Sequence, residues 1–440
     1  MKKQLTIEEK LQNALVPKEE QPYKIPNNWC WTYVSNVMNI VMGQSPKGVD
    51  TTQNVSDIPL VGGASDMGDL YPRVNKYTKK ATKLSKEDDV ILSIRATLGR
   101  PIFSDGVYCL GRGVAGISSN YLSKEFIRYY YICFESSLYS NATGTTFLQV
   151  TGSVLNKMLI PLPPLNEQQR IVERIESLFV KLDRAKELIE NILAQFEQNK
   201  MAILHKAFTG ELTAKWRKEK GLSKDTWKRK KISEVCTVVR GGSPRPAGSP
   251  QFYGGNIPFM KVADITNNDT PYINSTASFI KEAGLYKTRM VEANTLLLTN
   301  SGATLGVPAI CTFKTTFNDG IAAFLNLNPK SVKYYYYFFI SKTAELRGIN
   351  KGAAQPNLNT KIIGEIMHNV PTIEEQQEIV NILDKLLAKY NKIKNLEQQL
   401  EKIELLKKAI LAKAFRGELG TNNPDEESAE NLLKEILAEK

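Results

Sequence analysis

Hydrophobic positions recur with helical spacing in two long stretches of the chain. In both stretches apolar residues alternate at intervals of four and three, which is the pattern of a coiled-coil seam. The first seam contains Ile171, Ile175, Leu178, Leu182, Ile189, Ile192 and Phe196. The second contains Ile379, Leu383, Leu386, Tyr390, Ile393, Leu400 and Ile403, with one position skipped after Ile393. The sequence therefore predicts two long helices that pair through these residues.

The ends of both predicted helices carry helix-terminal signals. Asn166-Glu167-Gln168-Gln169 has the form of a capping box, and Thr372 is the cap of the second helix. Gly210 and Gly417 are suitable stops. The first helix also carries a second apolar flank that is too wide for a two-stranded contact alone. The flank consists of Val172, Phe179, Leu188 and Leu193.

The rest of the chain has the pattern of mixed α/β domains. Short β-type runs at Val90–Ile94 and Thr295–Thr299 end at glycine-rich turns. Aromatic clusters stand at matching positions of the two halves, at Tyr129–Tyr131 and Tyr334–Phe339. Such clusters suit base stacking, but more often they form the buried face of a helix or strand, and we favour core packing.

The two halves of the chain repeat each other. Ile203–Leu212 reads ILHKAFTGEL and Ile410–Leu419 reads ILAKAFRGEL, an offset of 207. The glutamates Glu167 and Glu375 and the tryptophans Trp29 and Trp227 also match. Each half is therefore one globular unit followed by one long helix. Equivalent helices pair most naturally about a pseudo-two-fold axis, hence antiparallel; in the alternative, each helix packs on its own domain.

The expected fold is thus mixed α/β, with two repeated globular domains joined by two long helices that form an antiparallel coiled coil with pseudo-two-fold symmetry. Its parts are an N-terminal extension (1–21), a first globular domain (22–162), a helical region (163–214), a second globular domain (215–370), a second helical region (371–420) and an acidic helical tail (421–440).

Composition excludes several classes of protein. The first 20 residues have no apolar run behind their lysines, and no stretch approaches the roughly 18 apolar residues of a membrane span. The 5 cysteines form no C-x-x-C pair, which is typical of reduced thiols in the cytoplasm. With only 2 histidines, most histidine-based metal and triad chemistry is excluded, and we expect no metal site. We do not expect a self-sufficient hydrolase.

Positive charge is concentrated in the two globular domains. Of the net charge of +12, residues 22–162 carry +4 and residues 228–370 carry +9. Such a distribution indicates two polyanion-binding bodies on a neutral scaffold, although solubility alone would also account for it. Basic and amide side chains of loops are therefore candidates for contacts to phosphates and bases, each with a turn or cap role as the alternative. These candidates are Ser45, Lys47, Arg73, Lys76, Lys79, Lys80, Arg240, Ser243, Arg245, Gln355, Asn357 and Asn359.

No catalytic motif is present. Gly43–Gly48 resembles the start of a phosphate-binding loop but lacks the required G-K-[ST]. An adenine methyltransferase needs an N-P-P-aromatic loop, and the nearest string, Asn422–Asp425, lies in the acidic tail. We therefore predict a binding protein without catalytic residues.

The repeated motifs resemble those of one known family. Pro161–Val172 reads PLPPLNEQQRIV and Lys206–Leu212 reads KAFTGEL, and second copies begin at Pro371 and Lys413. Together they resemble the specificity subunit of type I restriction-modification systems. The first-half counterpart of the loop around Gln355 departs from the pattern, because it carries Phe147 there.

This resemblance implies a division of labour. Each globular domain would be a target recognition domain that reads one half of a bipartite, asymmetric sequence in double-stranded DNA. The paired helices would set the unread spacer and dock two methylation subunits, and restriction subunits would join through them. S-adenosylmethionine, ATP and Mg²⁺ are expected on those partner subunits, and no cofactor on this chain.

Two other interpretations remain open. One is a fused methyltransferase or nuclease with an unfamiliar site, and the other is a coiled-coil adaptor that never reads DNA. Methyl transfer by the chain alone would indicate the first, and binding without any sequence preference would indicate the second.

Overall fold

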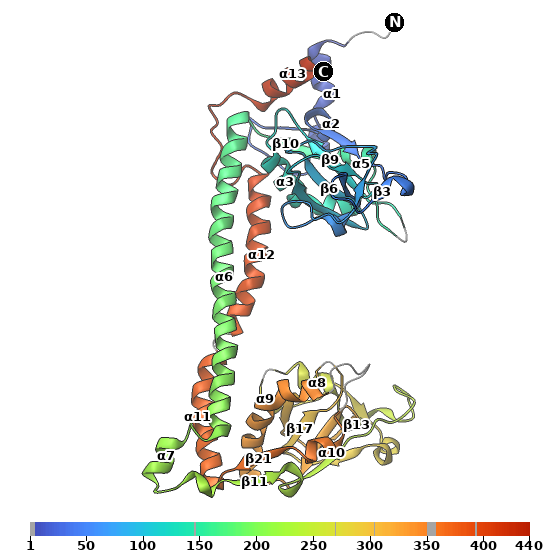
Figure 1. The fold of residues 1–440 in the computed structure, drawn as a ribbon. Coiled ribbons are helices and arrows are strands. Elements are labelled where there is room, and N and C mark those ends of the chain that lie inside the picture. Colours follow the sequence, from blue (N-terminus) through green and yellow to red (C-terminus); the bar gives the residue numbers. More distant parts are fainter. Residues whose placement is uncertain (1–4, 145–146, 269, 303, 350–357, 392–393) are drawn as a thin grey trace. The chain divides into compact units, whose positions relative to one another are not determined.

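The computed structural model describes residues 5–144, 147–268, 270–302, 304–349, 358–391 and 394–440 (Figure 1). Its contacts divide the chain into two compact units. Unit 1 consists of Met1–Ile189 with Gln398–Lys440, and unit 2 consists of Glu190–Glu397. Each unit therefore combines a globular α/β part with stretches of both helical regions.

Three sheets form in the described part of unit 1. A four-stranded antiparallel sheet has the order β2-β9-β6-β7, a second has the order β3-β5-β4-β8 with β4 and β8 parallel, and β1 pairs with β10. The strands are β1 (Cys30–Tyr33), β2 (Asn39–Met42), β3 (Thr51–Thr52), β4 (Ile58–Val61), β5 (Tyr77–Thr78), β6 (Val90–Arg95), β7 (Thr97–Phe103), β8 (Cys109–Leu110), β9 (Val114–Ser118) and β10 (Leu159–Leu162). The α-helices of its globular part and ends are α1 (Ile7–Ala14), α2 (Val34–Val37), α3 (Lys124–Cys133), α4 (Glu135–Ser140), α5 (Gly152–Lys157) and α13 (Ala429–Glu439).

Unit 2 repeats this arrangement. Its main sheet has the order β12-β20-β17-β18-β14, β13 and β19 are parallel, and β11 pairs with β21. The strands are β11 (Lys228–Lys231), β12 (Thr237–Arg240), β13 (Tyr253–Met260), β14 (Tyr272–Ile273), β15 (Phe279–Ile280), β16 (Arg289–Val291), β17 (Thr295–Thr299), β18 (Pro308–Cys311), β19 (Thr315–Phe317), β20 (Ile321–Leu325) and β21 (Met367–Val370). Its shorter α-helices are α7 (Ala214–Glu219), α8 (Val262–Thr266), α9 (Val332–Ile349) and α10 (Thr360–Gly364). The repeat in the sequence is therefore a repeat of the fold.

The cores lie on both faces of the central strands. On β6, Val90 and Leu92 belong to the core that α3 covers, whereas Ile91 belongs to a smaller core on the other face. On β17, Leu296 and Leu298 alternate in the same way with Leu297. This period of two is that of a strand buried on both sides. The predicted strands at these positions are confirmed.

The aromatic clusters belong to the cores, as predicted. Tyr130 and Tyr131 on α3 are fully buried, and so are Tyr334 and Phe339 on α9. The end of a long helix packs on each cluster. Phe415 contacts Phe126, Tyr130 and Phe134 in unit 1. In unit 2, Phe208 contacts Tyr334 and Phe338.

The predicted long helices are present. The first is α6 (Leu165–Thr209), which has 45 residues and a length of about 67 Å at 1.5 Å per residue. Gly210 follows it with φ +85°, a conformation that favours glycine. The second helical region is described as α11 (Ile373–Asn391) and α12 (Lys394–Ala414), on either side of residues 392–393.

The pairing of the helices is antiparallel within each unit. In unit 1, Asp183 on α6 pairs with Lys407 on α12, and Lys186 pairs with Glu404 at 2.9 Å, so one residue number falls as the other rises. In unit 2, Glu375 near the start of α11 binds Arg217, which lies beyond the end of α6. Figure 1 shows the same course of the helices in each unit.

The predicted seam residues differ in burial. Ile171, Ile175, Ile379, Leu383 and Ile403 are buried. Leu178, Leu182, Ile189, Phe196, Leu386 and Leu400 are half-buried, and Ile192 is 40% exposed. Ile393 and the side chain of Tyr390 lie outside the described residues.

A buried glutamate joins each globular part to a long helix. Glu167 accepts a hydrogen bond from Trp29 Nε1 at 2.7 Å, and Glu375 accepts one from Trp227 Nε1 at 2.8 Å. Both glutamates are fully buried. The predicted capping box at Asn166 is wrong. The helix begins at Leu165, so Asn166 lies inside it and cannot be the cap, and Gln169 Nε2 donates to Glu173 at 3.1 Å instead of reaching back to the start of the helix.

Candidate nucleic-acid interface

A loop that opens with glycine follows the first strand of the main sheet in each unit. Gly43 follows β2, and Gly241 follows β12. A Cβ atom on Gly43 would lie 2.1 Å from the carbonyl oxygen of Gly111, and one on Gly241 would lie 2.2 Å from that of Asn318. Both loops thus pass so close to another backbone segment that only glycine fits.

A serine holds each loop to the segment that it passes. In unit 1, Ser45 Oγ accepts a hydrogen bond from the backbone N–H of Arg112 at 3.3 Å. In unit 2, Ser243 Oγ donates to Asp319 Oδ1 at 2.6 Å. The two partners, Arg112 and Asp319, stand at equivalent positions of the repeat but carry opposite charges. The two loops therefore share the glycine and the serine, and they differ in the charge of the residue that the serine binds.

Four cations gather around the loop of unit 2. Arg240 Nε donates to the carbonyl oxygen of Asp319 at 2.6 Å, and the Arg245 guanidinium lies 3.8 Å from the Asp319 carboxylate. Arg289 Nε donates to the Arg240 carbonyl oxygen at 3.0 Å, and Lys287 Nζ to that of Arg245 at 3.4 Å. We call Arg240, Arg245, Lys287 and Arg289 the unit 2 basic patch.

An exposed aromatic ring lies beside this patch. Tyr286 is 77% exposed, and Lys287 Nζ lies 5.4 Å from the centroid of its ring. The cations can bind phosphates, and the exposed ring beside them can stack on a base. Lys287 and Arg289 are not among the residues predicted from the sequence. Arg289 lies on β16, which pairs with β19 beside the loop, and Lys287 lies just before this strand. The run Tyr286-Lys287-Thr288-Arg289, an aromatic followed by alternating cations, was the available signal.

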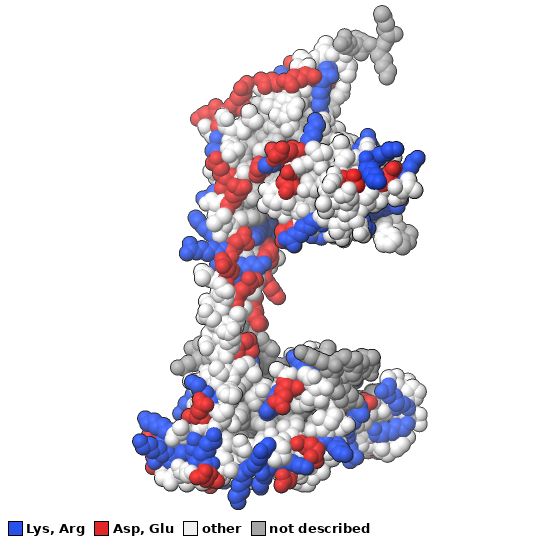
Figure 2. Space-filling view, in the orientation of Figure 1, with Lys and Arg blue, Asp and Glu red and all other residues white. Residues whose placement is uncertain are grey.

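In unit 1 the structure brings several predicted residues together. The backbone N–H of Lys79 donates to the Asp50 carbonyl oxygen at 2.9 Å, and the Thr82 hydroxyl binds the carbonyl oxygen of Gln44. The segment with Lys79 and Lys80 therefore lies beside the loop with Ser45 and Lys47. We call the exposed lysines Lys47, Lys79 and Lys80 the unit 1 basic patch. Figure 2 shows Lys and Arg side chains gathered over the edge of unit 1 that carries β3.

Other predicted residues have separate surroundings. Arg73 forms an exposed ion pair with Asp69 at 3.3 Å. Lys76 is exposed, and its carbonyl oxygen accepts from Leu60. Asn359 caps α10 by accepting from the Ile362 N–H at 2.8 Å, so its side chain has the cap role that the sequence left open. Gln355 and Asn357 lie outside the described residues.

Burial suppresses the reactivity of cysteine thiols in both units. Burial raises the pKa of the Cys30 thiol and of the Cys236 thiol to about 12, so both are poor nucleophiles at neutral pH. Nowhere in residues 5–440, apart from the gaps named above, do three His, Cys, Asp or Glu side chains form a group that could hold a metal ion. None of the helices described combines the length and apolar composition of a membrane span.

Comparison with known proteins gives one consistent family. The type I restriction modification DNA specificity domain matches residues 26–198 and 224–405, which is well over half of the chain. The EcoKI specificity subunit of Escherichia coli K12 is 25% identical over 95% of this chain and 96% of its own length. A putative MjaX specificity subunit from Methanocaldococcus jannaschii is 30% identical over 45% of this chain and 47% of its own.

Solved structures agree on the fold. A chain from a study of complex assembly and conformational transition in a type I restriction-modification system has a TM-score of 0.73 at 20% identity, covering 90% of this chain and 100% of that one. The HsdS subunit of Thermoanaerobacter tengcongensis has a TM-score of 0.54 at 21% identity, covering 91% of this chain and 99% of its own.

Proposed function

The chain belongs to the type I restriction modification DNA specificity family, and from this premise we propose that its two globular domains each read one half of a bipartite, asymmetric sequence in double-stranded DNA. The specificity subunit recognises DNA, and catalysis belongs to other subunits of the system. We assign the two readers to residues 22–162 and 215–370. The observation that carries the proposal is the glycine loop with its basic patch, which occurs once in each unit.

The helical regions 163–214 and 371–420 would set the unread spacer and dock two methylation subunits. Restriction subunits would join through these, and S-adenosylmethionine, ATP and Mg²⁺ would bind to the partners, in the cytoplasm. Exposed apolar side chains on the helices support a docking role, because a partner helix would remove them from water. They include Val180, Leu188, Ile192, Leu405 and Leu406, which are 67%, 55%, 40%, 64% and 50% exposed.

A DNA-binding experiment tests the proposal. In the complex with methylation subunits, the double variant Arg240→Gln, Arg245→Gln should bind target duplex at least about tenfold more weakly. The salt dependence of binding should become shallower by nearly one unit for each phosphate that the variant no longer neutralises. The matched control is Lys215→Gln, because Lys215 is 92% exposed on α7 and lies outside the patch. Wild-type affinity of the double variant would remove the patch from the interface.

Two further measurements separate the alternatives. Incubation of the chain alone with labelled S-adenosylmethionine and DNA should give no methyl transfer. Equal binding of target and scrambled duplexes, with and without the methylation subunit, would favour the adaptor.

A further inference from the structure

The chain's own N-terminal segment covers the outer edge of one short strand in unit 1. Leu15 forms an antiparallel bridge with Thr32 on β1, and the Val16 N–H donates to the Trp31 carbonyl oxygen at 3.0 Å. Thr32 Oγ1 also donates to the Ala14 carbonyl oxygen at 2.8 Å. Residues 14–16 thus add to β1 on the side that β10 does not occupy.

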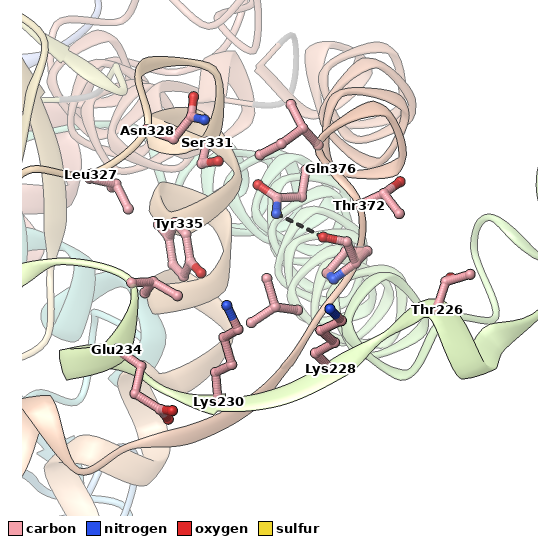
Figure 3. A pocket seen from close by; sticks show the side chains of 14 residues that line it. Thr226, Lys228, Lys230, Glu234, Leu327, Asn328, Ser331, Tyr335, Thr372 and Gln376 are labelled. Carbon is pink, nitrogen blue, oxygen red and sulfur yellow. Dashed lines mark hydrogen bonds between the residues drawn. The ribbon is translucent and has the colours of Figure 1, made fainter.

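The equivalent strand of unit 2 has no such cover among the described residues. β11 pairs with β21 just as β1 pairs with β10. On its other side no backbone hydrogen bond is described. A cavity of about 390 Å³ lies over the face of the β11–β21 pair that carries Lys228, Lys230 and Val370. In Figure 3, Lys228 and Lys230 project from β11 into the space that Tyr335 and Gln376 also line. Lys230 stands where Thr32 binds Ala14 in unit 1.

A buried acceptor in the wall of this cavity lacks a donor. Gln376 is 2% exposed, and its Nε2 donates to the Pro371 carbonyl oxygen at 3.0 Å. Its Oε1 atom has no hydrogen-bond partner in the part of the chain that the structure describes. A buried acceptor without a donor costs free energy. A ligand that brings an N–H group would remove that cost.

The charge of the strand indicates what kind of ligand fits. The edge in unit 1 is the neutral sequence Cys30-Trp31-Thr32-Tyr33, whereas β11 is Lys228-Arg229-Lys230-Lys231. Of these four cations only Lys231 has an ion pair among the described residues, with Glu365 at 2.6 Å. An occupant with carboxylates would complement the others.

We propose that the outer edge of β11 and the adjoining cavity bind an acidic, extended segment of a partner protein. This segment adds antiparallel to β11, as residues 14–16 add to β1, and places carboxylates near Lys228 and Lys230. Strand addition of this kind draws its affinity from main-chain hydrogen bonds and its specificity from the side-chain pockets.

The test uses the full-length chain and a peptide based on its own covering segment. The acidic probe is a fluorescein-labelled peptide of residues 7–18 with Lys10→Glu and Lys18→Glu, and the basic probe carries Glu8→Lys and Glu9→Lys instead. Fluorescence anisotropy should show binding of the acidic probe and at least about tenfold weaker binding of the basic one. Hydrogen exchange should show protection of residues 228–231.

Charge reversal on the strand provides the matched variants. Lys228→Glu with Lys230→Glu should weaken binding of the acidic probe at least about tenfold, while Lys79→Glu with Lys80→Glu, the same charge change in unit 1, should leave it unchanged. Unaltered exchange at residues 296–298 would show that unit 2 remains folded in the variant.

Three outcomes would overturn the proposal. They are the absence of probe binding, protection of residues 30–33 in place of 228–231, and protection of 228–231 by duplex DNA but not by the probe. The last result would assign the strand to the DNA track. DNA recognition through the unit 2 basic patch is tested separately, because the variants of that patch leave β11 unchanged.

Discussion

At the scale of single residues, His368 makes the stability of unit 2 depend on pH. Its Nε2 atom lies 2.9 Å from Tyr335 Oη, and its ring packs on Phe338. Burial lowers its pKa to about 4, whereas the unfolded chain has a value of about 6.5. Between these values the unfolded state binds a proton that the folded state does not. The stability that neutral His368 contributes is therefore present above pH 6.5 and is lost as the pH falls toward 4.

We expect the free energy of unfolding of unit 2 to fall by about 2 kcal/mol between pH 7 and pH 5. Urea unfolding followed by hydrogen exchange of β17 amides would measure this. His368→Gln should flatten the dependence, and His205→Gln, which removes the exposed histidine of α6, should leave it unchanged. A slope in His368→Gln equal to that of the wild type would assign the titration to another group.

At the scale of elements, each joint between a globular domain and a long helix contains a buried glutamate, but only one of the two glutamates is paired with a cation. Glu375 pairs with the buried Arg217 and accepts from Thr213 at 2.6 Å. Glu167 accepts from the neutral donors Trp29, Thr421 and Asn422. Loss of the carboxylate charge therefore has different consequences at the two joints, because only the joint of unit 2 contains a buried cation.

Glu375→Gln should destabilise unit 2 by about 3–5 kcal/mol, since it leaves Arg217 buried without a counter-charge. Glu167→Gln, the matched change in unit 1, should cost about 1–3 kcal/mol, which is the range for a buried donor left without an acceptor. Adding Arg217→Met to Glu375→Gln should recover part of the loss. A double variant no more stable than Glu375→Gln, measured by urea unfolding, would contradict this account.

The sequence predicts an element well when the residues that determine it are close together in the chain, and poorly when they are far apart. The period of α6 persists over its whole length, so local pattern was sufficient. The capping box was placed too late because the helix already begins at Leu165, directly after the prolines. The role of Glu167 could not be predicted locally, because its partner Trp29 is 138 residues away. Lys287 and Arg289 were missed for a similar reason. Their place beside the glycine loop depends on the pairing of β16 with β19, in the register Met290↔Thr316, which no local pattern encodes.

At the scale of the whole molecule, the repeat links the two readers through both helical regions. α6 begins at the Glu167–Trp29 joint of unit 1, and Phe208 near its end packs in the core of unit 2. The second region begins at the Glu375–Trp227 joint of unit 2, and Phe415 after its end packs in the core of unit 1. Each reader is thus fixed to one helix start and one helix end. If the helices set the spacer, their lengths must change together.

We therefore expect a matched insertion to lengthen the spacer without altering what is read. One heptad inserted after Glu190 in α6 and another between α11 and α12 would preserve the seam and add about 10.5 Å, or about three base pairs. Methylome sequencing of cells that express this variant with the methylation subunits should give the same half-sites with a longer gap. Replacing residues 22–162 by another reader is the complementary control, and it should change one half-site and keep the gap. Altered half-sites in the insertion variant would mean that the helices shape recognition itself, because the readers' own residues are untouched.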